Sequence, residues 1–160
     1  MARLADLTLK HRLFMRAYRY RSIDCSPGAH LTKPLAESKL ALVTTAALHL
    51  PEQPPFDPEI RGGDHSFREL PGNVDVSRLK IAHNSSAFDQ TGAWKDRNLV
   101  FPLDRLREMQ TAGEVGALNR RHFSFMGSIT APGRLIQESA PAVAQMLLED
   151  KVDAALLVPV

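Results

Sequence analysis

Three of the six histidines stand at the ends of short apolar runs, where hydroxyl and amide side chains also gather. His49 follows the run 39–48, and His83 ends the run 78–83 just before an Asn-Ser-Ser sequence. His122 begins a third run, 122–129. An imidazole can act as an acid, a base or a metal ligand near neutral pH. The ends of these runs are therefore the candidate positions for chemistry.

His83 and Asp89 form the pair best suited to catalysis, because a carboxylate can fix the tautomer of an imidazole and raise its basicity. His122 is the third candidate for proton transfer. A zinc site built from His49, His83 and His122 is conceivable, but their spacings follow no zinc pattern, so we expect no metal. Each histidine taken singly can also be an ordinary polar residue of a loop. The candidates for substrate binding are Thr45, His49, Arg68, Ser85 and Ser124.

The segments that would position these residues alternate between strand and helix patterns. Continuous apolar runs predict buried strands over 39–48, 78–83, 122–129 and 152–160, the third including its exit loop. Helices are predicted from Pro102 to a stop at Gly113 and from Ala140 to Asp150. This alternation indicates an α/β fold with a mainly parallel sheet and flanking helices, doubly wound and flavodoxin-like. Ligands bind beyond the carboxyl ends of the strands in such sheets, so we expect a site there.

Residues 51–73 contain five prolines and three glycines, which predicts a long irregular loop. Four apolar side chains lie within it, at Phe56, Ile60, Phe67 and Leu70. These residues can anchor the loop against a core, so we expect it to be ordered.

The first 21 residues carry six Lys or Arg against one Asp, although the whole chain has a net charge of only +2. Leucine and aromatic residues at helical spacing predict an amphipathic helix that ends near Arg21, followed by an extended connection over 22–37. We divide the chain into this N-terminal part, 1–32, and an α/β part, 33–160. Cys25 is read as an incidental loop residue, with a reactive or resolving thiol as the alternative.

The composition and the absent motifs exclude several classes of protein. The chain has 160 residues, 44% of them hydrophobic, and no apolar run approaches the roughly 18 residues of a membrane span. No signal peptide is visible, which favours the cytoplasm. A single cysteine excludes an intrachain disulfide framework. There is no nucleic-acid-reading motif, and the GxGxxG, GxxxxGK[ST] and GxSxG patterns are absent, which counts against nucleotide cofactors and serine hydrolysis.

Several stretches occur together in one order, namely ALVTTAALHL (41–50), QPPFD (53–57), GDHSFRELPG (63–72), FD (88–89), LVFPLDRLREM (99–109), HFSFMGSI (122–129) and EDKVDAALLVPV (149–160). From about residue 33 onward, the chain resembles the selenoprotein B type subunit of glycine/sarcosine/betaine reductase and D-proline reductase. The resemblance implies an oxidoreductase that reductively cleaves the C–N bond of a small amino-acid-like substrate.

The same resemblance implies a selenocysteine or cysteine directly after Val160, followed by Pro-x-Cys. We therefore expect that the chain is truncated at a UGA codon, that its sheet is incomplete at the C-terminus, and that by itself it is inactive. No cofactor is expected in this chain, whereas a partner subunit would carry a pyruvoyl group. Homo-oligomers are also possible on this reading. The alternatives are a non-catalytic small-ligand or subunit-binding α/β domain and a metal enzyme or hydrolase that uses the three histidines.

Overall fold

The computed structural model describes residues 8–18, 28–85, 88 and 90–160, and it divides the chain into two units, 1–30 and 31–160. In the first unit, helix α1 (Leu9–Ala17) is capped by Thr8, and none of its residues is buried. The backbone of Tyr18 is extended, so the helix ends at Ala17 and not near Arg21 as predicted. Cys25 lies outside the described residues.

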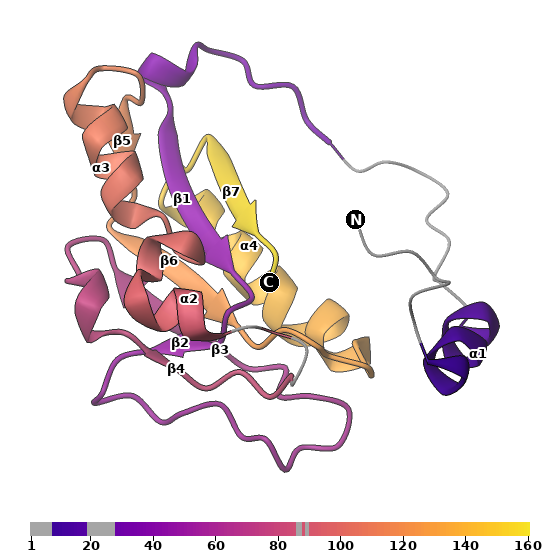
Figure 1. The fold of residues 1–160 in the computed structure, drawn as a ribbon. Helices are drawn as coiled ribbons and strands as arrows, with labels where there is room; N and C mark the ends of the chain where they lie inside the picture. Colours follow the sequence, from indigo (N-terminus) through magenta and orange to yellow (C-terminus); the bar gives the residue numbers. More distant parts are fainter. Residues whose placement is uncertain (1–7, 19–27, 86–87, 89) are drawn as a thin grey trace. The chain divides into compact units, whose positions relative to one another are not determined.

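The second unit is built on a mainly parallel sheet (Figure 1), which confirms the predicted α/β class. Strand β1 (Lys39–Thr44) pairs in parallel with β5 (Ala117–Leu118) and β6 (Arg121–Phe125) and with β7 (Ala154–Val158). Strand β3 (Phe67–Pro71) joins the far edge of β6 in the antiparallel direction. The flavodoxin-like arrangement of this class stays a prediction.

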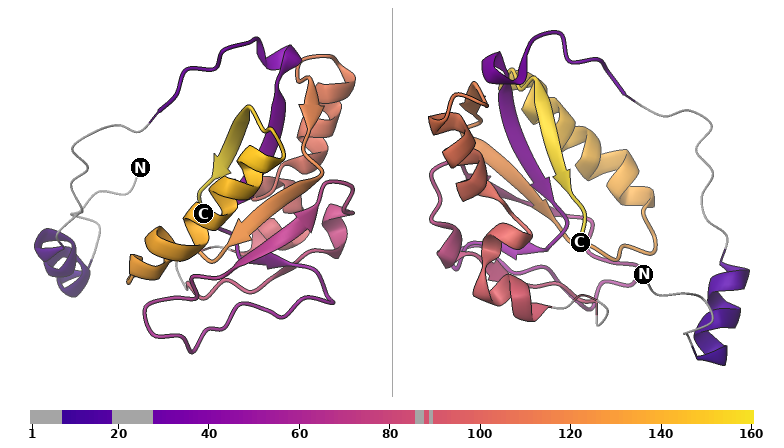
Figure 2. Two further views of the ribbon diagram at one scale, coloured as in Figure 1. Left: turned by 180° about the vertical axis from the view of Figure 1, so that it is seen from behind. Right: turned by 45° about the horizontal axis from the view of Figure 1, so that its top comes forward.

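Helices cover both faces of this sheet, as Figure 1 and the view from behind at the left of Figure 2 show. Helix α3 (Leu103–Thr111) packs with Leu40 and Leu42 of β1, and helix α4 (Ala140–Glu149) packs with Phe123 and Phe125 of β6. Alternate residues of a strand point to opposite faces, so one sheet contributes to both cores. A π-helical turn, Leu135–Ser139, precedes α4. Other short elements include η2 (Leu35–Glu37), α2 (Gln90–Lys95) and η4 (Arg97–Leu99).

Two predicted strands differ from the observed ones. The run 39–48 is broken after Thr44, because Ala47 has a φ of 52° and the chain turns into a separate strand, β2 (Leu48–His49). The run 78–83 does not enter the main sheet. It gives the end of η3 (Val76–Arg78) and then β4 (Lys80–Ile81), which pairs with β2 in the antiparallel direction.

The segment 51–73 is not wholly irregular, because its last part forms β3. Among the described residues, strand β7 pairs with β1, and in the 160-residue chain the side chains of Leu156 and Leu157 are 40% and 67% exposed. Within the described ranges, no helix has the length and apolar character needed to cross a bilayer.

Candidate functional site at the carboxyl edge of the sheet

Thr45 ties together the carboxyl ends of β1 and β7. Its backbone N–H donates to the carbonyl oxygen of Val158 at 3.1 Å, and its Oγ1 accepts the N–H of Val160 at 2.8 Å. The side chain predicted to bind substrate is thus engaged in holding the segment that follows β7. This edge is the one where ligands bind in parallel α/β sheets.

His83 lies at the same edge, in the loop that follows β4. Its side chain is buried, with 8% exposure, and its ring lies edge-on to Phe88 at 4.9 Å between centroids. Nδ1 accepts the backbone N–H of Ser85 at 3.0 Å, whereas Nε2 has no hydrogen-bond partner among the described residues. Burial lowers the pKa of His83, which favours its neutral form.

Gly127, in the turn after β6, allows the close approach of His83. A Cβ atom at Gly127 would collide with Nε2 of His83, and it would lie 2.9 Å from the carbonyl oxygen of Thr45 and 3.1 Å from that of Val160. Side chains of any other type are therefore excluded from this point. We did not select Gly127 from the sequence, although a glycine directly after a buried strand was the available signal.

Two other predicted members of the site lie in this loop. The backbone of Ser85 donates to His83, and its side chain is half-buried. Asp89, the predicted carboxylate partner of His83, is outside the described residues, so the pair stays a prediction.

His122 does not lie at the carboxyl edge, so its predicted position is wrong. It is the second residue of β6 and is completely buried inside the sheet. Its Nδ1 accepts the backbone N–H of Leu42 at 3.0 Å, and its ring packs edge-on against Phe101. Burial, together with the charge of Arg107, lowers the pKa of His122 to about 4. The geometry gives this histidine a role in the strand pairing.

Ser124 and His49 are also engaged by the backbone. The Oγ of Ser124 accepts the N–H of Leu48 at 2.7 Å and is fully buried, while Nδ1 of His49 lies 2.8 Å from the carbonyl oxygen of Leu50. Within the part of the chain that the structure describes, no group of three His, Cys, Asp or Glu residues could hold a metal ion. The three-histidine zinc site is therefore not formed.

Arg68 holds the loop before β3 instead of pointing into open space. Its guanidinium donates to the carbonyl oxygens of Pro54 and Pro55 at 2.8 and 3.0 Å, and it stacks on Phe56 at 4.2 Å. It also donates to the Oγ of Ser66 and to the carbonyl oxygen of Phe67. Most of its donors are therefore used, which leaves little capacity for a substrate carboxylate.

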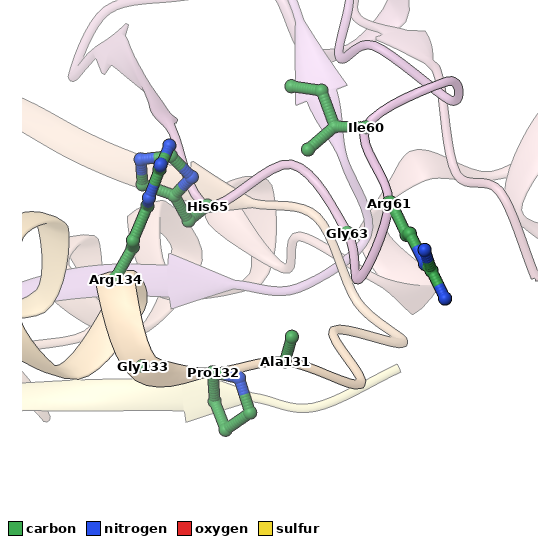
Figure 3. Close-up of a pocket in the computed structure, with 8 residues that line it drawn as sticks. All are labelled: Ile60, Arg61, Gly63, His65, Ala131, Pro132, Gly133 and Arg134. Atoms are coloured by element: carbon green, nitrogen blue, oxygen red, sulfur yellow. The ribbon is translucent and has the colours of Figure 1, made fainter.

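A hollow of about 420 Å³ lies between the turn that contains Gly62 and Gly63 and the segment 131–134 before α4 (Figure 3). In the figure His65 and Arg134 lie on one side of it, whereas Arg61 points away. His65 also lies 3.5 Å from Glu138. An adjoining hollow of about 440 Å³ shares the same turn and reaches Asn84 and Met126, the neighbours of His83 and Gly127 in the chain. None of the residues predicted to bind substrate lines either hollow.

The chain is similar to subunits of several amino-acid reductases. It is 34% identical over 127 residues to D-proline reductase subunit gamma of Acetoanaerobium sticklandii, an alignment that covers 79% of this chain and 50% of that protein. It is 27% identical over 152 residues to glycine reductase complex component B subunit gamma of Symbiobacterium thermophilum, covering 93% and 34%. It is 24% identical over 144 residues to sarcosine reductase complex component B subunit beta of Peptoclostridium acidaminophilum, covering 90% and 33%.

The chain thus spans between a third and a half of the length of these curated relatives. No solved structure matches it. The family model described as glycine/sarcosine/betaine reductase selenoprotein B matches residues 4–160, which is nearly the whole sequence. The chain therefore belongs to the glycine/sarcosine/betaine reductase selenoprotein B family.

Proposed function

We propose that this chain supplies the α/β scaffold of a reductase subunit that reductively cleaves the C–N bond of a small amino-acid-like substrate. The family match over residues 4–160 carries the proposal. The relatives named above are subunits of reductases for D-proline, glycine and sarcosine, which supports a zwitterionic substrate and partner subunits.

The chemistry requires a nucleophile and an activated amine. A selenolate or thiolate directly after Val160 would supply the nucleophile, and a pyruvoyl group on a partner subunit would activate the substrate nitrogen for cleavage. This chain's own residues have the supporting task. The Oγ1 of Thr45 accepts the backbone N–H of Val160, and Gly127 lets the ring of His83 approach the same point. These contacts support a reaction site at the carboxyl edge of the sheet.

The first test is the nucleotide sequence downstream of the Val160 codon. We expect a TGA or cysteine codon in the next position, followed in frame by Pro-x-Cys codons. Any other codon there, or no such motif, would refute the proposed nucleophile.

The second test is activity. We expect the full-length protein, combined with its pyruvoyl-bearing partner and a dithiol reductant, to cleave the C–N bond of at least one of glycine, sarcosine, betaine or D-proline. Cleavage releases a free amine from the first three substrates and opens the ring of D-proline. The 160-residue chain with the same partner is the control, and we expect it to cleave none of them. Amine release by the 160-residue chain would show that the nucleophile lies within it.

A further inference from the structure

The neighbours of His83 hold its ring in one tautomer. Nδ1 accepts the backbone N–H of Ser85 at 3.0 Å, so Nδ1 carries the lone pair and the single proton of the neutral ring is on Nε2. A protonated imidazolium would turn a second N–H toward the N–H of Ser85, which is repulsive. The side chain is therefore a neutral donor with a fixed direction.

The Nε2–H group is buried, and it has no acceptor within the described ranges. The whole side chain is 92% buried, and buried polar groups in native proteins nearly always have a partner. The unpartnered donor lies against Gly127 at the edge where β1, β6 and β7 end. Within the described ranges, the fold therefore leaves a buried donor unmatched at this edge of the sheet.

The backbone around this point is shaped for close approach. Gly127 has no Cβ in front of Nε2, and the next atoms that a Cβ there would meet are the carbonyl oxygens of Thr45 and Val160. Ala47 and Ser128 have φ values of 52° and 59°, in the left-handed region that non-glycine residues rarely adopt. Such strained positions concentrate at functional sites.

We infer that His83 is a fixed hydrogen-bond donor to an anionic acceptor atom in the reductase reaction, and that it does not act as a proton shuttle. The inference rests on the proposed function, which contains two such anions. One is the selenolate or thiolate expected after Val160, and the other is the carboxylate of the substrate. A hydrogen bond to an anion is stronger than one between neutral groups.

Two substitutions distinguish the acceptor role of Nδ1 from the donor role of Nε2. In His83→Asn the short side chain can still accept the N–H of Ser85, but it places no donor at the position of Nε2. In His83→Gln the longer amide can place an N–H there. His30→Gln, at an exposed position, is the matched control. All variants are made in the full-length protein with its partner, and thermal unfolding checks that they fold.

The first readout is the pH dependence of alkylation of the nucleophile by iodoacetamide. If the donor serves the nucleophile, His83→Asn raises the pKa of the nucleophile by about 1 or more, and His83→Gln restores it in part. The second readout is amine release. If the donor serves the carboxylate, His83→Asn raises KM about tenfold or more and leaves the alkylation profile unchanged. A folded His83→Asn protein with unchanged alkylation and unchanged KM would overturn the inference.

Nitrogen NMR of His83 tests the same inference without turnover. We expect the Nε2–H tautomer at pH 7–8, and an Nδ1–H tautomer or a cationic ring in this range would overturn the inference even if the enzyme is active. Absence of amine release by the wild-type complex would instead refute the proposed function.

Discussion

Acidification should destabilise the fold through His122, because its buried ring is neutral in the native state. Burial lowers its pKa from 6.5 to about 4, whereas the ring is free to take up a proton in the unfolded chain. The unfolded state therefore binds more protons as the pH falls below 6.5, and the stability that His122 contributes above this pH is lost. The linkage relation gives a loss of about 2 kcal/mol at pH 5 and about 3 kcal/mol at pH 4.

His122→Phe isolates this effect from the carboxylates, which also titrate in acid. Phenylalanine keeps the ring packing on Phe101 but cannot titrate, and it leaves the N–H of Leu42 without its acceptor. The variant should be less stable than the wild type by about 1–3 kcal/mol at pH 7. This difference should disappear or change sign by pH 4.

Urea unfolding followed by circular dichroism at several pH values between 7 and 4 measures the free energy of unfolding of each protein. His30→Phe, at an exposed position, is the control and should follow the wild-type curve. Parallel curves for the wild type and His122→Phe across this range would refute the reasoning about a buried neutral histidine.

Three further substitutions test other contacts. Gly127→Ala should destabilise the fold by about 1–3 kcal/mol and displace the ring of His83, so that the full-length complex loses amine release. Normal stability and activity of this variant would contradict the close approach of His83 to Gly127. Asp150→Asn should lower the free energy of unfolding at pH 7 by about 3 kcal/mol, because the Asp150 side chain is 5% exposed and accepts an N–H of Arg121 at 2.6 Å. A change below a few tenths of a kcal/mol in urea unfolding would argue against this ion pair. Arg68→Leu should make the loop 51–66 sensitive to limited proteolysis, because Arg68 donates to the carbonyl oxygens of Pro54 and Pro55, and KM for the substrate should change little. A large increase in KM would instead support the predicted role of Arg68 in substrate binding.

The helices and the long parallel strands could be predicted because their signals are local. Pro102 marks the start of α3, and Gly113, with a φ of 75°, follows its end. The apolar runs that became β1 and β7 are long enough to exclude a loop.

The errors arise where tertiary contacts decide. Strand β3 has only one fully buried residue, Leu70, in a segment rich in proline and glycine, so it has no clear strand pattern. The run 78–83 has the composition of a strand, but composition does not tell which strand it pairs with.

Only part of the candidate site could be predicted, because its other members are set by tertiary contacts. His83 and Thr45 were predicted at the carboxyl edge and lie there, and Val160 joins them. His122 was misplaced because a strand that begins at Arg121 puts the next residue at its amino end, which apolar composition does not reveal. Gly127 was missed because its importance depends on a ring that approaches from a loop 44 residues earlier in the chain.

We propose that the nucleophile of the reductase follows Val160 and lies beside His83. Mass spectrometry of the active full-length complex after treatment with iodoacetamide tests it most directly. We predict that the label appears on the residue directly after Val160, that substrate slows the labelling, and that amine release is lost in proportion to the label. Full activity in the labelled complex, or loss of activity that follows labelling of Cys25 instead, would contradict the account.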